Sequence, residues 1–163
     1  MSTAPKKPPR ASRPHMPGYG IPRSKDGLLP WTWAAKRLEN AHTYWLATTR
    51  PNGQPHAMPV WCVWLEGRLF FSTGRRSRKA RNLARDPRCS VGLTHGKDSV
   101  ILEGKARRVR DAALARRVSS VYSKKYDSGI PAGEPVYGVE PQVAFGFTET
   151  GDFLRTATRW KFG

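Results

Sequence analysis

Apolar and polar residues alternate along several short runs of the chain, and this period of two predicts β-strands. The first runs are residues 43–49 and 56–65, which flank an Asn-Gly pair at residues 52–53, of the type that favours a tight hairpin. A Glu-Gly turn at residues 66–67 then leads into residues 68–73. We therefore expect three consecutive strands of an antiparallel meander here.

Three other segments repeat their apolar residues every three to four positions, which predicts short amphipathic helices. The first covers residues 31–40. The second begins after Ser77, a hydroxyl residue that suits an N-cap, and ends before Pro87. Asp111 caps the third, whose apolar stripe consists of Leu114, Val118, Val121 and Tyr122.

The strand pattern returns in residues 89–94, 99–109 and 143–147, with a bend or bulge expected at Gly104. Residues 127–141 contain three Pro and three Gly, which predicts a loop. Six strands, mostly joined by hairpins and interrupted by short helices, predict a mainly β (α+β) fold. Its expected form is a closed or nearly closed six-stranded antiparallel barrel.

Charge is distributed unevenly along the chain, and it separates a tail from a domain. Residues 1–25 hold six Pro, six basic residues and no acid, so residues 1–27 are expected to form a flexible basic arm. Residues 28–163 are expected to form one domain. This domain remains basic, because the whole chain carries a net charge of +17 and residues 1–25 account for only six of the positive charges. Such a field attracts nucleic acid, acidic membranes or a polyanionic small molecule.

Other features argue against several classes of protein. Cys62 and Cys89 form neither a disulfide framework nor a CxxC metal motif, and they are expected to be small core residues. The four His are scattered, so no metal site is predicted. No apolar run is long enough to span a membrane and no signal-peptide pattern is present, so a cytoplasmic protein is expected.

The stretch RRSRKARNLARDP, residues 75–87, is the most charged segment with a helical pattern. If Ser77 caps the helix, free backbone N–H groups and the helix dipole create an anion site at that end, where Arg78 and Lys79 add charge. Three interpretations remain open at this level. The charges form a solvated helix face, a nucleic-acid backbone site, or a site for a small phosphate ligand.

Three blocks, GQPHAMPVW, LFFSTGRRSRKARNLARDPR and EGKARRV, occur in an order that resembles the pyridoxamine 5'-phosphate oxidase-like superfamily of split β-barrel flavoproteins. The resemblance covers roughly residues 30–110. It implies an FMN-binding type of split β-barrel as the cofactor-binding domain. It also implies a homodimer with two cofactor sites at the subunit interface.

The resemblance further implies which residues bind the cofactor. Thr73, Ser77, Arg78 and Lys79 match the positions that bind its phosphate. The residues expected beside its ring are Met58, Pro59, Val60 and Trp61. Two further positions are Asn82 in the helix motif and Ser99, which matches a position that reaches the partner's cofactor. Trp160 near the C-terminus has two interpretations, a residue that folds back over the cofactor or an aromatic that seals the core of the dimer.

Met58 and Val63 stand where oxidases acting on pyridoxamine phosphate carry Arg and Lys, which argues against that activity. The RKARNL and TRWKFG segments are more similar to an actinobacterial-type branch that uses coenzyme F-420, a deazaflavin, or FMN. The implied activity is hydride transfer to or from a small unsaturated or carbonyl-containing molecule, with no catalytic side chain assigned.

Two alternatives to an oxidoreductase remain. One is a carrier that holds the cofactor without turnover, and the other is a nucleic-acid-binding barrel, which the expected burial of strand aromatics disfavours. His56 has two interpretations, a ring-facing proton donor or an ordinary hydrogen-bonded residue at a strand end.

Overall fold

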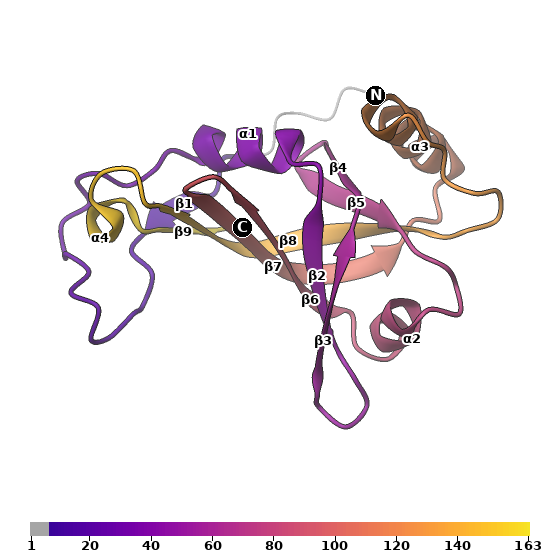
Figure 1. The fold of residues 1–163 in the computed structure, drawn as a ribbon, viewed down its shortest axis with the longest axis horizontal. Coiled ribbons are helices and arrows are strands. Elements are labelled where there is room, and N and C mark those ends of the chain that lie inside the picture. The colour runs from indigo at the N-terminus through magenta and orange to yellow at the C-terminus, as the bar shows by residue number, and fades with distance from the viewer. Residues whose placement is uncertain (1–6) are drawn as a thin grey trace.

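The computed structural model describes residues 7–163, which form one antiparallel sheet with short helices around it (Figure 1). The described part contains nine strands and four helices. The main path of the sheet runs in the order β1-β9-β8-β7-β6-β2-β3, while β5 pairs with β8 and β4 pairs with β5. A mainly β fold with short helices is therefore confirmed, whereas the expected count of six strands is wrong.

The predicted meander is present, but its second strand is divided. Residues 56–65 form two strands, β3 (Pro55–Val60) and β4 (Cys62–Leu65), with the break at Trp61. β3 pairs only with β2 (Tyr44–Thr49), whereas β4 leaves to pair with β5 (Arg68–Ser72). Pro59 lacks an N–H and so suits the free edge of a sheet.

A long hairpin forms the middle of the sheet. It joins β6 (Arg88–His95) to β7 (Asp98–Arg108), and β7 pairs along its whole length with β8 (Val136–Thr148). The predicted irregularity at Gly104 is confirmed by a register shift between β7 and β8 at Glu103/Gly104. A β-carbon at Gly104 would lie 2.1 Å from the Glu140 carbonyl oxygen, so only glycine fits this bulge.

β8 is longer than predicted, because it includes residues that were expected to form a loop. Its first part, from Val136 to Val139, pairs with β5, and residues 143–146 pair with β9 (Thr158–Lys161). Two glycines in β8 make room for aromatic rings, Gly138 for Phe70 and Gly146 for Trp160. Of the Gly and Pro residues that suggested a loop, Gly138 and Pro141 lie in β8, and Gly138 there serves close packing against Phe70.

The sheet does not close into a barrel. β3 lies at one end of the main path with a free edge, and β5 and β9 share the outer edge of β8. The expectation of a closed or nearly closed barrel is therefore not met by the described residues. The alternating pattern identifies strands and their faces, but it carries no information about which edges meet.

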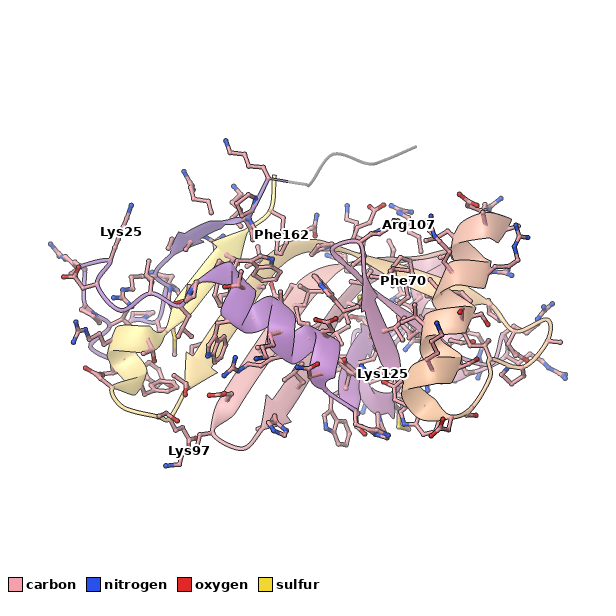
Figure 2. All side chains as sticks on the ribbon, turned by 90° about the horizontal axis from the view of Figure 1, so that it is seen from above. Lys25, Phe70, Lys97, Arg107, Lys125 and Phe162 are labelled. Carbon is pink, nitrogen blue, oxygen red and sulfur yellow. The ribbon has the colours of Figure 1, made fainter. Side chains whose placement is uncertain are left out.

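The helices cover the sheet at different places (Figure 1). They are α1 (Trp31–Asn40), α2 (Arg78–Arg85), α3 (Ala112–Tyr126) and α4 (Phe153–Thr156). β4 contacts both α1 and α3, and both helices lie in front of the sheet in Figure 2. α2 instead packs against β2. The predicted caps Ser77 and Asp111 are both confirmed.

Two apolar clusters form the core. The larger one surrounds Trp160 and Leu46 inside the sheet, and it includes the buried thiols Cys62 and Cys89, as predicted. The smaller cluster packs Val118 and the rest of the α3 stripe against β4, β5 and β8. Among the described residues, no helix is both long enough and apolar enough to cross a bilayer.

Part of the segment expected to be a flexible arm is built into the fold. Residues 10–12 form β1 (Arg10–Ser12), which pairs with β9. The Arg13 guanidinium then donates to four carbonyl oxygens, those of Ser24, Asp26, Arg155 and Ala157. The expectation of a flexible arm is therefore wrong for these residues. The arm was predicted from its lack of an apolar pattern, but the segment is held by backbone pairing and by the hydrogen bonds of one guanidinium, which require no such pattern. Residues 1–6 lie outside the described part.

Candidate functional site

One face of β3 opens toward a pocket. His56, Met58 and Val60 point to the same face as their partners Thr48, Leu46 and Tyr44 on β2. His56 and Val60 are buried, yet Met58 between them is 43% exposed. Beside this opening lies a pocket of about 370 Å³, here named the Trp61 pocket. Its lining residues are Thr43, Pro59, Val60, Trp61, Ser72, Thr73 and Lys79.

The N-terminus of α2 lies at one side of the Trp61 pocket. The Ser77 hydroxyl accepts a hydrogen bond from the Ala80 N–H at 3.1 Å and lies 3.1 Å from the Thr73 hydroxyl. Arg78 and Lys79, both half-buried, follow in the first turn. Neither forms an ion pair with any described residue. Hydroxyls, helix N–H groups and two cations without a described ion-pair partner suit an anion, so this end of α2 is the candidate anion site.

The turn that leads into α2 is fixed from the side of the loop before β8. The Glu134 carboxylate accepts a hydrogen bond from the Arg75 N–H at 3.0 Å, and the Arg75 guanidinium donates to the Gly133 carbonyl. The Ser72 hydroxyl donates to the Pro135 carbonyl at 2.9 Å. These contacts hold the Thr73 side of the pocket in place.

The other side of the pocket is aromatic. The Trp61 ring, 38% exposed, stacks on the Tyr126 ring with centroids 4.6 Å apart and planes 3° apart. His42 packs edge-on against Trp61, with ring centroids 5.8 Å apart. A flat aromatic surface beside an anion site suits a ligand that joins a planar ring to a phosphate.

The C-terminal turn of α3 positions Trp61. The Tyr126 hydroxyl accepts from the Cys62 N–H at 2.9 Å and lies within 2.9 Å of the Cys62 and His42 carbonyls, the two acceptors for its proton. Cys62 directly follows Trp61 in the chain, and His42 directly precedes Thr43. One hydroxyl therefore links the two segments that carry Thr43 and Trp61 into the pocket lining. Burial raises the pKa of Tyr126, which keeps this hydroxyl protonated.

Lys125 strengthens the same junction. Its ammonium donates to the Glu39 carbonyl, the Tyr44 hydroxyl and the Cys62 carbonyl at 2.9–3.0 Å. Burial lowers the pKa of Lys125 and raises that of Tyr44, which would oppose their charged forms. All three ammonium donors have acceptors, so Lys125 ties α1, β2 and the break before β4 together.

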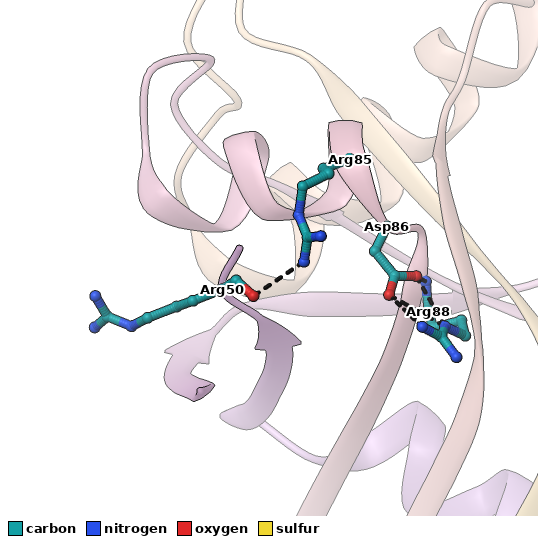
Figure 3. A network of polar contacts seen from close by, with 4 residues as sticks. All are labelled: Arg50, Arg85, Asp86 and Arg88. Atoms are coloured by element: carbon teal, nitrogen blue, oxygen red, sulfur yellow. Dashed lines mark hydrogen bonds and ion pairs between the residues drawn. The ribbon is translucent and has the colours of Figure 1, made fainter. Parts of the chain in front are cut away.

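The C-terminal end of α2 is fixed by arginines (Figure 3). The Arg85 guanidinium donates to the Arg50 carbonyl at 2.9 Å, which joins α2 to the β2–β3 hairpin. Asp86 and Arg88 form an ion pair at 2.6 Å, and hydrogen bonds from Arg88 lower the pKa of Asp86 to about 2. The Arg85 contact therefore anchors the C-terminal end of α2, and the Asp86–Arg88 pair fixes the turn that follows it.

A small polar group lies beneath α2. Asn82, 1% exposed, donates from its amide nitrogen to the Thr48 hydroxyl at 3.0 Å, while its amide oxygen has no partner among the described residues. His56 is buried close by on β3, and its Nδ1 also lacks a described partner. Burial and the nearby cations Arg50, Lys79 and Arg78 lower the pKa of His56.

Most residues expected to bind a cofactor come together, but two do not. Pro59, Val60, Trp61, Thr73 and Lys79 line the Trp61 pocket, with Met58, Ser77 and Arg78 beside it and Asn82 beneath α2. Trp160 is fully buried in the core, where its ring packs 5.4 Å from Trp31, so it does not reach the pocket. Ser99 lies in the β6–β7 hairpin with its hydroxyl 3.4 Å from that of Thr94.

Sequence reasoning missed several residues that build the site. Thr43 and Ser72 line the pocket; both were assigned to predicted strands but not to the site. His42 was missed, and so was the stacking of Tyr126 on Trp61, because stacking between segments far apart in sequence has no local signal. Tyr122 was expected to be a core residue, which is confirmed. Within residues 7–163, no group of three His, Cys, Asp or Glu is arranged around a metal site.

An open antiparallel sheet that carries a helix N-terminus with hydroxyls and cations beside an aromatic wall suits an anionic ligand with a planar ring. The chain belongs to the pyridoxamine 5'-phosphate oxidase family, whose model matches residues 33–146. This family lies in a superfamily of flavin-binding proteins that includes oxidoreductases. No curated protein matches the sequence.

Three solved structures illustrate the shared fold. The conserved hypothetical protein Rv2991 from Mycobacterium tuberculosis has a TM-score of 0.70 and 24% identity, covering 77% of this chain and 88% of that one. A heme binding protein from Mycobacterium smegmatis has a TM-score of 0.65 and 21% identity, covering 77% and 57%. An F420 reductase has a TM-score of 0.56 and 22% identity, covering 67% and 93%.

Proposed function

We propose that this protein is an oxidoreductase that binds coenzyme F-420, with FMN as the alternative cofactor, and transfers hydride to or from a small unsaturated or carbonyl-containing molecule. The observation that carries the proposal is the Trp61 pocket, where the α2 N-terminus and Lys79, which has no ion-pair partner in residues 7–163, face a stacked Trp61 ring. A bound flavin or deazaflavin supplies the redox chemistry itself. The protein must then anchor, orient and shield it.

The residues of the site divide these tasks between them. Arg78, Lys79 and the Ser77 cap hold a phosphate, and Thr73 adds a hydroxyl donor. The exposed Met58 and Trp61 offer apolar surface along which a planar ring lies and excludes water from one face. No acid or base is needed for this role. The residues therefore fit a phosphorylated ring cofactor.

Charge favours the deazaflavin over FMN. Coenzyme F-420 carries a phosphodiester and a polyglutamate tail, which interact with more positive charge than the single phosphate of FMN. Exposed Arg75, Arg76 and Arg81 lie on α2 or on the turn before it, close to the anion site. The polyglutamate tail of a bound coenzyme F-420 would leave the pocket near these three cations and interact favourably with them.

The function is tested by titrating the purified wild-type protein with coenzyme F-420 and with FMN, following fluorescence at moderate salt. We expect micromolar or tighter binding of F-420 and weaker binding of FMN. Turnover of the reduced cofactor with a panel of enones and quinones then separates an enzyme from a carrier. Failure to bind either cofactor, with a salt-dependent mobility shift of nucleic acid in the same buffer, would contradict the proposal.

The proposed active form is a homodimer built on the outer face of the sheet. Trp45, 56% exposed, lies across from Gly92 on β6, which in turn pairs with Ile101 on β7 and then Phe145 on β8. A continuous apolar surface across four strands is typical of a protein–protein contact. Ser99 lies two residues from Ile101 on the same face, so a partner's cofactor could lie near it.

Replacing Ile101 by Lys is expected to convert the dimer to a monomer, because a charge at the centre of an apolar interface loses its solvation on association. Size-exclusion chromatography with light scattering at micromolar protein measures the result. Ser120→Lys, which adds the same side chain on the exposed side of α3, is the control and should remain dimeric. A wild-type protein that is monomeric under these conditions would contradict the proposed dimer.

A further inference from the structure

The buried ring of His56 has two unlike nitrogens. The side chain is 8% exposed, and Nδ1 is enclosed without a hydrogen-bond partner among the described residues. Nε2 also has no described protein partner, but it is not among the enclosed atoms, so it is the nitrogen that reaches the open side of the ring. The imidazole therefore turns one nitrogen inward and offers the other to whatever occupies the space beside β3.

The surroundings decide which nitrogen carries the proton. A proton on Nδ1 would be an enclosed N–H with no acceptor, which costs more than an enclosed lone pair. The neutral ring is therefore protonated on Nε2, and a second proton would have to enter at Nδ1. Burial and the cations Arg50, Lys79 and Arg78 lower the pKa of His56, which also keeps the ring neutral at pH 7.

The groups around His56 leave its outward N–H without a protein acceptor. Arg50 precedes β3, Arg78 and Lys79 lie on α2, and all three carry only donors. The Thr48 hydroxyl on β2 is already engaged by the Asn82 amide of α2 and lies near the His56 carbonyl. The ring is buried but its Nε2–H faces the open side, and the three neighbouring cations offer it no acceptor, so an oxygen of a ligand bound there is the partner that this donor would take.

We propose that His56 is a ligand-binding residue, whose neutral Nε2–H donates a hydrogen bond to a phosphate or hydroxyl oxygen of the phosphorylated chain that links the anion to the ring of the bound cofactor. This inference rests on the proposed function and adds a residue to its site. His56 would add a directed donor to the anion site without adding charge. It would thereby favour ligands with an acceptor oxygen next to the phosphate over a bare planar ring.

Asparagine and glutamine separate this role from simple packing. The amide nitrogen of Gln reaches the position of Nε2, whereas that of Asn reaches only the position of Nδ1. We expect His56→Asn to weaken binding of the cofactor that the wild type prefers by about 10- to 100-fold. His56→Gln should stay within about threefold of the wild type, on the same principle that the donor is retained.

Two measurements distinguish binding from structure. Melting temperatures of the ligand-free variants should be similar to one another, and ¹⁵N NMR should find the His56 proton on Nε2 at pH 7, with a shift of that resonance on titration with the cofactor or with inorganic phosphate. Equal loss of affinity in both variants, unchanged affinity in His56→Asn, or a proton on Nδ1 would overturn the proposal.

The outcomes also separate this inference from the proposed function. A wild type that binds neither F-420 nor FMN overturns the proposed function, and a His56 resonance that does not respond to phosphate then overturns this inference as well. A wild type that binds a cofactor, together with His56 variants that bind it equally well, overturns only the assignment of His56.

Discussion

Replacing Arg78 and Lys79 together by alanine is expected to weaken cofactor binding by about 100-fold or more while leaving the folded protein intact. Each charge-assisted contact to a phosphate contributes roughly 1.5–3 kcal/mol, so loss of two such contacts removes about two decades of affinity or more. Both side chains are half-buried and form no ion pair with the described residues, so their removal leaves no buried partner unpaired. Fluorescence titration measures the affinity.

The control for this variant must remove the same charge elsewhere. Arg107→Ala combined with Arg116→Ala removes two exposed guanidinium groups, one on β7 and one on α3, and should change the affinity by less than about fivefold, since exposed charges act weakly. The melting temperature of either double variant should stay within about 3 °C of the wild type. Equal loss of affinity in both would mean that net charge, and not the α2 N-terminus, governs binding.

Gly104→Ala is expected to have the largest effect on stability. A β-carbon there would overlap the Glu140 carbonyl oxygen at 2.1 Å and the Glu140 carbonyl carbon at 2.9 Å, and backbone cannot move aside as a flexible side chain can. Overpacking of this kind costs about 2–4 kcal/mol. The melting temperature of the ligand-free protein should fall by roughly 5–15 °C, as measured by circular dichroism.

Gly129→Ala tests whether this cost comes from the bulge. Gly129 lies in the loop after α3, outside the four strands of the proposed dimer face, and a β-carbon there would have its nearest neighbour, the Ser123 hydroxyl, at 3.9 Å. Its replacement should change stability by less than about 1 kcal/mol. If the Gly104→Ala protein had the same melting temperature as the wild type, β7 and β8 would be able to change register at Glu103 without loss of stability, contrary to this prediction.

Local signals in the sequence predicted much of the fold. The meander, the three longer helices, the Ser77 and Asp111 caps and the irregularity at Gly104 all depend on residues close together in the chain. The open sheet, the division of residues 56–65 and the strand within the expected arm depend instead on which edges pair. Pairing between distant strands leaves no periodic pattern, so these features could not be predicted.

The candidate site divides in the same way. Its anion end follows from one contiguous motif, because a cap, a helix start and two cations act within three residues, Ser77 to Lys79. Its aromatic end depends on Tyr126 and Lys125, which reach Cys62 from more than 60 residues away. Trp160 shows the opposite error, since an aromatic residue near a terminus can be a core residue as readily as a ligand contact.

The short β1 strand also affects how the protein behaves in concentrated solution. β1 pairs with one side of β9, while β8 pairs with the other, so β9 has no free edge over its paired length. A chain shortened to begin after Ser12 would expose unpaired backbone N–H and carbonyl groups of β9 next to apolar residues of the main core. Such an edge can add strands from other molecules, so β1 protects this sheet against self-association and aggregation.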